Sequence, residues 1–210
     1  MSTLLLLRHA TTAATGKTLG GRTEAPLDEG GRAQAAAAAE RLAGVKLAAV
    51  YASPLTRTME TARIVAASHG LGVRPAEGLL EVEYGTWTDK PLAQAAKTKL
   101  WPLIQQRPSQ VTFPGGETIR GMQLRAVDAI EEIVARHPKG TVLAVSHADV
   151  IKAVVSHYLG QPLDLFQRIA IAPASVTVLR VGEGMPPMLL RLNDDGHLAP
   201  PPPRRTVRNG

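Results

Sequence analysis

The chain has 210 residues, of which 44% are hydrophobic and 20% charged, with a formal net charge of +6 at pH 7. This size and composition are typical of one globular domain with a buried core. Cysteine is absent, which excludes disulfides, thiolate metal sites and cysteine nucleophiles, and no apolar run approaches the ~20 residues of a membrane-spanning helix. Because the residues after Met1 do not resemble a signal peptide, we expect a cytoplasmic protein without a membrane partner.

Short apolar runs bounded by turn residues predict three strands that are buried on both faces, at 4–7, 47–51 and 142–145. Between the first two, the alanine-rich stretch 31–42 predicts a helix, and Gly44 follows its end. The chain therefore begins with a strand, a helical crossover and a second strand.

The dipeptide Ser53-Pro54 matches an N-cap followed by a first helical proline, which predicts a helix from there to Ala67. Pro102 is expected to kink or break the next helical segment, 92–106. The remaining elements are predicted to be helices over 119–137 and 149–159 and a pair of strands in "ASVTVLRV" and "MPPMLLRLN".

This order of elements predicts a layered α/β fold with a mostly parallel sheet and an antiparallel edge. We expect one domain over residues 1–197 and a disordered tail over 198–210, because the tail has four consecutive prolines and little apolar character. Three of the positive charges lie in this tail and the body has few aromatic residues, so we predict no nucleic-acid partner. An edge strand over 176–180 would allow a homodimer.

Basic side chains follow all three core strands: Arg8-His9, Arg57 and His147. Each alone is more often a surface ion pair or a hydrogen-bonded polar residue. The carboxyl ends of neighbouring parallel strands, however, meet at one crevice, where ligands bind. Arg57 falls in the first turn of a helix, where the helix dipole favours anions. The convergence predicts a phosphoryl site.

Two histidines without a cysteine or a nucleotide-type glycine loop suggest covalent transfer through an imidazole, with His9 as nucleophile. The six histidines show no recognisable metal-ligand spacing, so we predict neither a metal nor another cofactor.

The segments "LLLLRHATT", "SPLTRTMETA", "LLEVEYGTWTD", "FPGGET" and "AVSHADVIKAV" resemble the histidine phosphatase superfamily, in its phosphoglycerate mutase-like branch, and most closely a bacterial subgroup labelled probable phosphomutases. The resemblance implies a three-layer α/β/α sandwich, a phosphohistidine at His9, and a phosphate pocket formed by Arg8, Arg57 and a protonated His147. It also implies that Glu81 is the proton donor, which would require a raised pKa. Glu83 is the rival carboxylate, since residues two apart in an extended segment face the same side.

Further substrate or phosphate contacts are expected from Thr15, Gly21, Arg22 and Ala148. Thr15 stands where the family has asparagine, and it retains a hydroxyl that can donate to phosphate from a shorter side chain. Ala10 and Ala148 replace family glycines without removing a catalytic group. Arg22 is alternatively expected to pair with Glu24 or Asp28 at the surface.

For the leaving group, Tyr84, Trp87 and the loop 115–117 are candidate contacts, although we expect Trp87 to pack in the core. The segment 89–118 is a modest insertion, and family mutases carry longer capping segments. We therefore predict a phosphomonoesterase that acts on a small phosphate ester. A phosphoglycerate mutase-like phosphomutase and a non-catalytic phospho-ligand-binding protein are the alternatives.

Overall fold

The computed structural model describes residues 1–182 and 184–198. A six-stranded sheet forms its centre, in the order β3-β2-β4-β1-β5-β6. Strands β3, β2, β4 and β1 are parallel, whereas β5 pairs antiparallel with β1 and β6 antiparallel with β5. The strands are β1 (Ser2–Arg8), β2 (Ala49–Ala52), β3 (Val73–Pro75), β4 (Thr141–Ser146), β5 (Val176–Val181) and β6 (Met188–Asp194).

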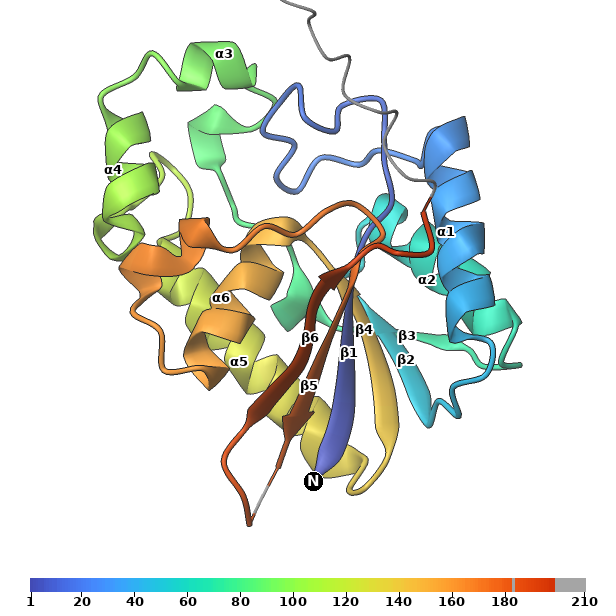
Figure 1. The fold of residues 1–210 in the computed structure, drawn as a ribbon. Helices are drawn as coiled ribbons and strands as arrows, with labels where there is room; N and C mark the ends of the chain where they lie inside the picture. The colour runs from blue at the N-terminus through green and yellow to red at the C-terminus, as the bar shows by residue number, and fades with distance from the viewer. Residues whose placement is uncertain (183, 199–210) are drawn as a thin grey trace, which may run out of the picture.

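Helices cover both faces of this sheet, which confirms the predicted three-layer α/β/α sandwich (Figure 1). Helices α1 (Glu29–Leu42) and α2 (Thr56–Ala67) lie on one face, and α5 (Ile119–Arg136) and α6 (Ala148–Tyr158) on the other. The short helices α3 (Leu92–Ala95) and α4 (Leu100–Gln106) lie beyond one end of the sheet. Single 3-10 turns are η1 (Glu77–Leu79), η2 (Gly85–Trp87), η3 (Pro108–Gln110) and η4 (Leu163–Arg168).

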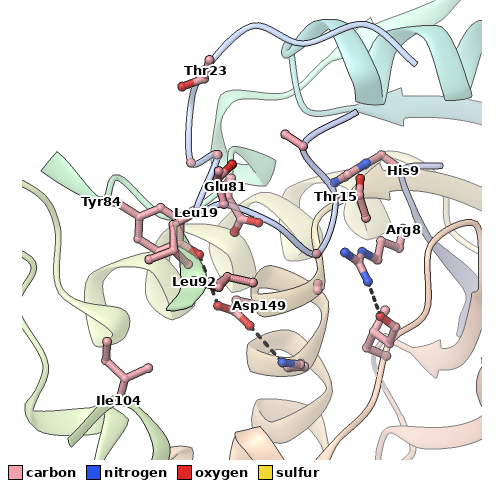
Figure 2. A pocket seen from close by; sticks show the side chains of 18 of the residues that line it. Arg8, His9, Thr15, Leu19, Thr23, Glu81, Tyr84, Leu92, Ile104 and Asp149 are labelled. Atoms are coloured by element: carbon pink, nitrogen blue, oxygen red, sulfur yellow. Dashed lines mark hydrogen bonds and ion pairs between the residues drawn. The ribbon is translucent and has the colours of Figure 1, made fainter. Parts of the chain in front are cut away.

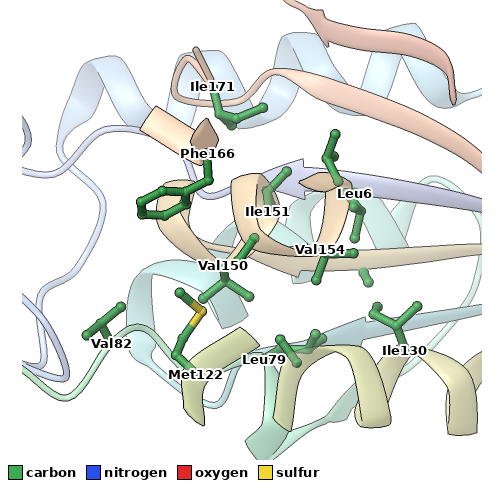
Figure 3. Close-up of a cluster of buried hydrophobic side chains, with 14 of the residues drawn as sticks. Leu6, Leu79, Val82, Met122, Ile130, Val150, Ile151, Val154, Phe166 and Ile171 are labelled. Carbon is green, nitrogen blue, oxygen red and sulfur yellow. The ribbon is translucent and has the colours of Figure 1, made fainter. Parts of the chain in front are cut away.

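Alternation along β1 connects the two layers of the core. Leu4 and Leu6 belong to the apolar cluster shared with α5 and α6, and Leu5 and Leu7 to the cluster shared with α1 and α2. Side chains alternate between the faces of a strand, so a run of four leucines fills both layers at once. Figure 3 shows the first cluster, to which Leu6 and side chains from η1, α5, α6 and η4 contribute. The predicted core strands are confirmed.

The helix breaks only partly follow the expectations. The segment 92–106 divides into α3 and α4. Pro102 lies in the first turn of α4, where the backbone N–H groups have no partner within the helix, so a proline there removes no hydrogen bond. Helix α2, by contrast, begins at Thr56 with Leu55 as its N-cap, and no side chain caps it. The prediction that Ser53 is the N-cap was therefore wrong.

Two edges of the sheet differ from the expectations. Strand β3 was missed because it has only three residues, mostly exposed, and ends in Pro75. Strand β5 lies between β1 and β6, so the edge strand expected over 176–180 is inside the sheet, and a homodimer cannot form there. The homodimer itself stays a prediction. Residues 199–210, most of the expected tail, lie outside the described residues, and among the residues described no helix is long and apolar enough to cross a membrane.

Candidate active site

A cavity of about 510 Å³ lies beyond the carboxyl ends of the central strands, where the sequence predicts the site. Parallel pairing brings the strand ends together, since Arg8 is the register partner of Ser146, and the Ser53 amide donates to the Val145 carbonyl. The cavity wall includes seven of the nine predicted catalytic and phosphate-binding residues, shown in part in Figure 2: Arg8, His9, Thr15, Gly21, Arg57, Glu81 and Ala148.

His9 is the first residue after β1 and is 6% exposed. Its Nδ1 lies 2.8 Å from the carbonyl oxygen of Ala10, an acceptor, so Nδ1 carries the proton and Nε2 keeps a free lone pair. Burial, reinforced by the positive charges of Arg57 and Arg8, lowers the pKa of His9 to about 3. The ring is therefore neutral and nucleophilic at physiological pH.

The two arginines reach this cavity from β1 and from the first turn of α2. Arg57 donates to the carbonyls of Thr23 at 2.8 Å and Gly21 at 2.6 Å, and Arg8 donates to Ile171 at 2.7 Å. The Nε of Arg8 is buried without a hydrogen-bond partner among the described residues. Burial lowers the pKa of both arginines, but Arg remains charged at neutral pH. Two cations thus face the cavity with donors available for an anion.

His147 lies beside His9, with 5.2 Å between the ring centroids. Nη2 of Arg57 lies 3.3 Å from its Nδ1, and the Oγ of Ser53 lies 2.9 Å from its Nε2. Because a guanidinium can only donate, Nδ1 accepts and Nε2–H donates to Ser53. Burial, followed by the charge of Arg57, holds the pKa of His147 well below its usual range. His147 is therefore neutral in the ligand-free protein, and its protonated form with phosphate bound stays a prediction.

Glu81 follows η1 and turns its carboxylate into the same cavity (Figure 2). Oε2 lies 3.9 Å from Nδ1 of His147, and Oε1 accepts from the amide of Val82 at 3.0 Å. Burial, reinforced by the negative charge of Asp149, raises the pKa of Glu81 to about 7, against the opposing charges of Arg57 and Arg8. A carboxyl group with this pKa can both give and take a proton near neutral pH.

The backbone around Glu81 is held by arginines outside the cavity. Arg125 donates to the carbonyls of Gly78, Leu80 and Glu81, at 2.8 to 3.1 Å, and pairs with Glu117 at 2.6 Å. The expected contact loop 115–117 therefore supports this segment rather than lining the cavity.

Arg22 also lies outside the residues that line the cavity. It pairs with Glu83 at 3.2 Å and Glu117 at 3.4 Å, and its Nε lies 3.3 Å from the Glu81 carbonyl. Neither Glu24 nor Asp28 is its partner: Glu24 accepts from Thr56, and Asp28 caps α1. The pairing predicted for Arg22 was wrong. The rival carboxylate Glu83 is engaged by Arg22, and it does not line the cavity.

The other predicted phosphate contacts, Thr15, Gly21 and Ala148, line the cavity but differ in what their polar groups bind. Thr15 lines the cavity, but its hydroxyl accepts from the Thr12 amide at 2.8 Å and so supports the turn after His9. Ala148 is the first residue of α6, with its amide at the helix N-terminus. Gly21 accepts from Arg57 through its carbonyl, and a Cβ there would approach the Tyr84 ring to 2.9 Å.

Tyr84 lines the far part of the cavity, whereas Trp87 is 5% exposed and packs against Phe113, as expected. Sequence reasoning gave no role to two charged residues here, Asp149 and Lys152, which are paired at 3.0 Å. The sequence could have indicated them, because both lie in the first turn of the helix predicted directly after His147. The lining also includes six large apolar side chains: Leu19, Leu92, Trp101, Ile104, Phe113 and Ile119.

In residues 1–182 and 184–198, no three His, Asp or Glu side chains are grouped closely enough to hold a metal ion. The expectation that the protein needs no metal or other cofactor stays a prediction.

Comparisons with known proteins agree with this geometry. Phosphoserine phosphatase 1 of Hydrogenobacter thermophilus is 30% identical over 94% of this chain and 95% of its own length. An acid phosphatase of Mycobacterium tuberculosis is 32% identical over 87% of this chain and 88% of its own. The solved structure of Bacillus stearothermophilus YhfR has a TM-score of 0.88 and 31% identity, covering 94% of this chain and 99% of that one. A family model described as histidine phosphatase superfamily (branch 1) matches residues 4–195. The chain belongs to this superfamily and is a phosphatase.

Proposed function

We propose that the protein hydrolyses the phosphomonoester of a small metabolite through a phosphohistidine at His9, with Glu81 as general acid and then general base. The observation that carries this proposal is the neutral His9 ring, whose Nε2 lone pair is left free because Nδ1–H donates to Ala10. A nucleophile needs such a lone pair. Attack on phosphorus makes the ring positive, and the Ala10 carbonyl then stabilises that charge.

The first step forms the Nε2–P bond and breaks the P–O bond of the ester. The departing alkoxide takes the proton of Glu81, and Arg8 and Arg57 stabilise the charge on the phosphoryl oxygens. In the second step the Glu81 carboxylate takes a proton from water, and the resulting hydroxide attacks phosphorus. The P–N bond breaks, its electron pair returns to Nε2, and inorganic phosphate leaves. An approaching phosphate dianion also raises the proton affinity of His147, whose Nδ1 then takes a proton from solvent, gives up the hydrogen bond from Arg57 and donates to the phosphate.

Hydrolysis is favoured over mutase activity by the phosphatase names of relatives that match this chain over most of its length. In the cavity, the cation Lys152 is engaged by Asp149 and by Gln167, each at 3.0 Å. Arg168 is a further cation of the lining, and a second phosphate would meet it there. The assay therefore has to measure phosphoryl transfer as well as hydrolysis.

The test is a panel of phosphorylated metabolites, assayed for phosphate release and for transfer between substrate hydroxyls. Wild type should release phosphate and should be labelled by radioactive substrate when quenched in alkali, where phosphohistidine is stable. His9→Ala should lose both signals. Activity that survives His9→Ala would overturn the mechanism, and transfer that outpaces phosphate release would favour a mutase. Substrate binding without turnover in wild type would favour the non-catalytic alternative.

A further inference from the structure

Asp149 is the second residue of α6 and points into the cavity, where the mechanism above gives it no task (Figure 2). Its Oδ1 accepts from Nζ of Lys152 at 3.0 Å, and its Oδ2 lies 3.4 Å from the hydroxyl of Tyr84. Two donors therefore hold this carboxylate, and one of them is a cation. An ion pair with a side-chain exposure of only 15% for Lys152 and 23% for Asp149 is a fixed feature of the cavity wall.

Glu81 is the second carboxyl group of this cavity, and the charged groups that face it come from several elements. Arg8 of β1 and Arg57 of α2 favour its ionised form, whereas burial and Asp149 of α6 favour its protonated form. Nδ1 of His147 lies 3.9 Å from Oε2 of Glu81. The hydroxyl of Tyr84, another residue of the cavity wall, donates to Asp149. The arginines are needed for phosphate, so burial and the negative charge of Asp149 together have to oppose them if Glu81 is to keep its proton.

We propose that Asp149 is a positioning residue whose negative charge keeps the proton on Glu81 in the free enzyme, and that Lys152 is the counterion that limits this effect. The inference rests on the proposed role of Glu81 as general acid. It gives the ion pair a function in catalysis: the pair sets the highest pH at which the leaving group still receives its proton.

The test compares Asp149→Asn and Lys152→Met by the pH profile of kcat/KM. With an alkyl phosphate, whose alkoxide leaves only with a proton, Asp149→Asn should move the alkaline limb down by about one pH unit. At pH values above the limb this is about a tenfold loss. Lys152→Met removes the counterion and should move the limb upward. With 4-nitrophenyl phosphate, whose leaving group needs no proton, both shifts should largely vanish.

Matched controls remove equal charges away from the cavity. Asp128→Asn on α5 and Lys46→Met, both at exposed positions, should leave the profiles where they are. A direct readout is the carbon-13 NMR titration of the Glu81 carboxyl, identified by its loss in Glu81→Gln. The midpoint of this titration should move down in Asp149→Asn and up in Lys152→Met, and the measurement needs no turnover.

Opposite shifts of the two variants support the proposal, because a merely structural loss would lower the rate at every pH. Superimposed profiles, or shifts in the same direction, would overturn it. If Asp149→Asn does not fold, the upward shift in Lys152→Met and the NMR titration decide alone. The proposed function fails separately, if Glu81→Gln turns over the alkyl phosphate at the wild-type rate.

Discussion

The hydroxyl of Ser53 lies 2.9 Å from Nε2 of His147 and supports the ring from the side opposite Arg57. Both residues are fully buried. Ser53 lies three positions before the first residue of α2, the helix that it was expected to cap, and instead supports the site by holding the His147 ring.

Ser53→Ala is expected to leave the Nε2–H of His147 unpaired, which costs ~1–3 kcal/mol in the free energy of unfolding. The ring should also lose its fixed orientation, so kcat/KM should fall. Urea denaturation and initial rates measure the two effects. Ser156→Ala is the matched control, because the Oγ of Ser156 is buried without a partner among the described residues. Equal destabilisation by the two substitutions would contradict this account.

Gly116→Ala is expected to displace the segment that carries Glu81. A Cβ at Gly116 would lie 2.1 Å from the carbonyl oxygen of Glu83, a backbone atom that cannot move alone. Overpacking of this kind lowers the free energy of unfolding by ~1–3 kcal/mol. The value of kcat should fall as well, because the displaced segment carries Glu81. Gly44→Ala, where a Cβ meets nothing within 4 Å, should change neither property. Thermal melts and phosphate release test the pair, and an unaffected Gly116→Ala would show that the segment adapts.

Arg125→Met is expected to impair proton transfer more than phosphate binding. The substitution removes the donors to three carbonyls, including that of Glu81, but Arg125 does not itself line the cavity. The rate should therefore fall more for an alkyl phosphate than for 4-nitrophenyl phosphate. Arg136→Met removes an exposed i,i+4 pair with Glu132 and should be neutral. An equal loss on both substrates would argue against this role of Arg125.

Acid should destabilise the fold through the buried imidazoles. The pKa of His9 lies near 3 in the folded chain and at about 6.5 when unfolded, so the unfolded chain binds more protons between these values. The contribution of His9 to the free energy of unfolding should therefore fall as pH drops from 6.5 toward 3, while the raised pKa of Glu81 acts in the opposite direction between about 7 and 4.5. His9→Asn should make this decline shallower, whereas His157→Asn, at an exposed position, should not. Urea titrations at several pH values measure the slopes, and equal slopes in His9→Asn and wild type would refute the assignment.

The sheet and the phosphate end of the cavity could be predicted because their causes are local. Four leucines between turn residues define β1, and the basic residues that end three strands follow from parallel pairing. The supports around Glu81 could not be predicted, because Arg125 is 44 residues away along the chain from the carbonyl it holds. Arg22 was assigned to the ligand for the same reason: its partners Glu83 and Glu117 come from distant loops. The charge state of His147 depends on burial, which only the packed structure reveals.

The bond from His9 to Ala10 uses only the backbone of Ala10. What the nucleophile requires of its neighbour is a carbonyl oxygen, and every amino acid supplies one. The methyl of Ala10 is fully buried and packs in a cluster with Leu27, Ala35 and Ala174. Position 10 is therefore limited by available volume and not by the chemistry of its side chain, so a larger residue there should cost stability while leaving the tautomer of His9 in place.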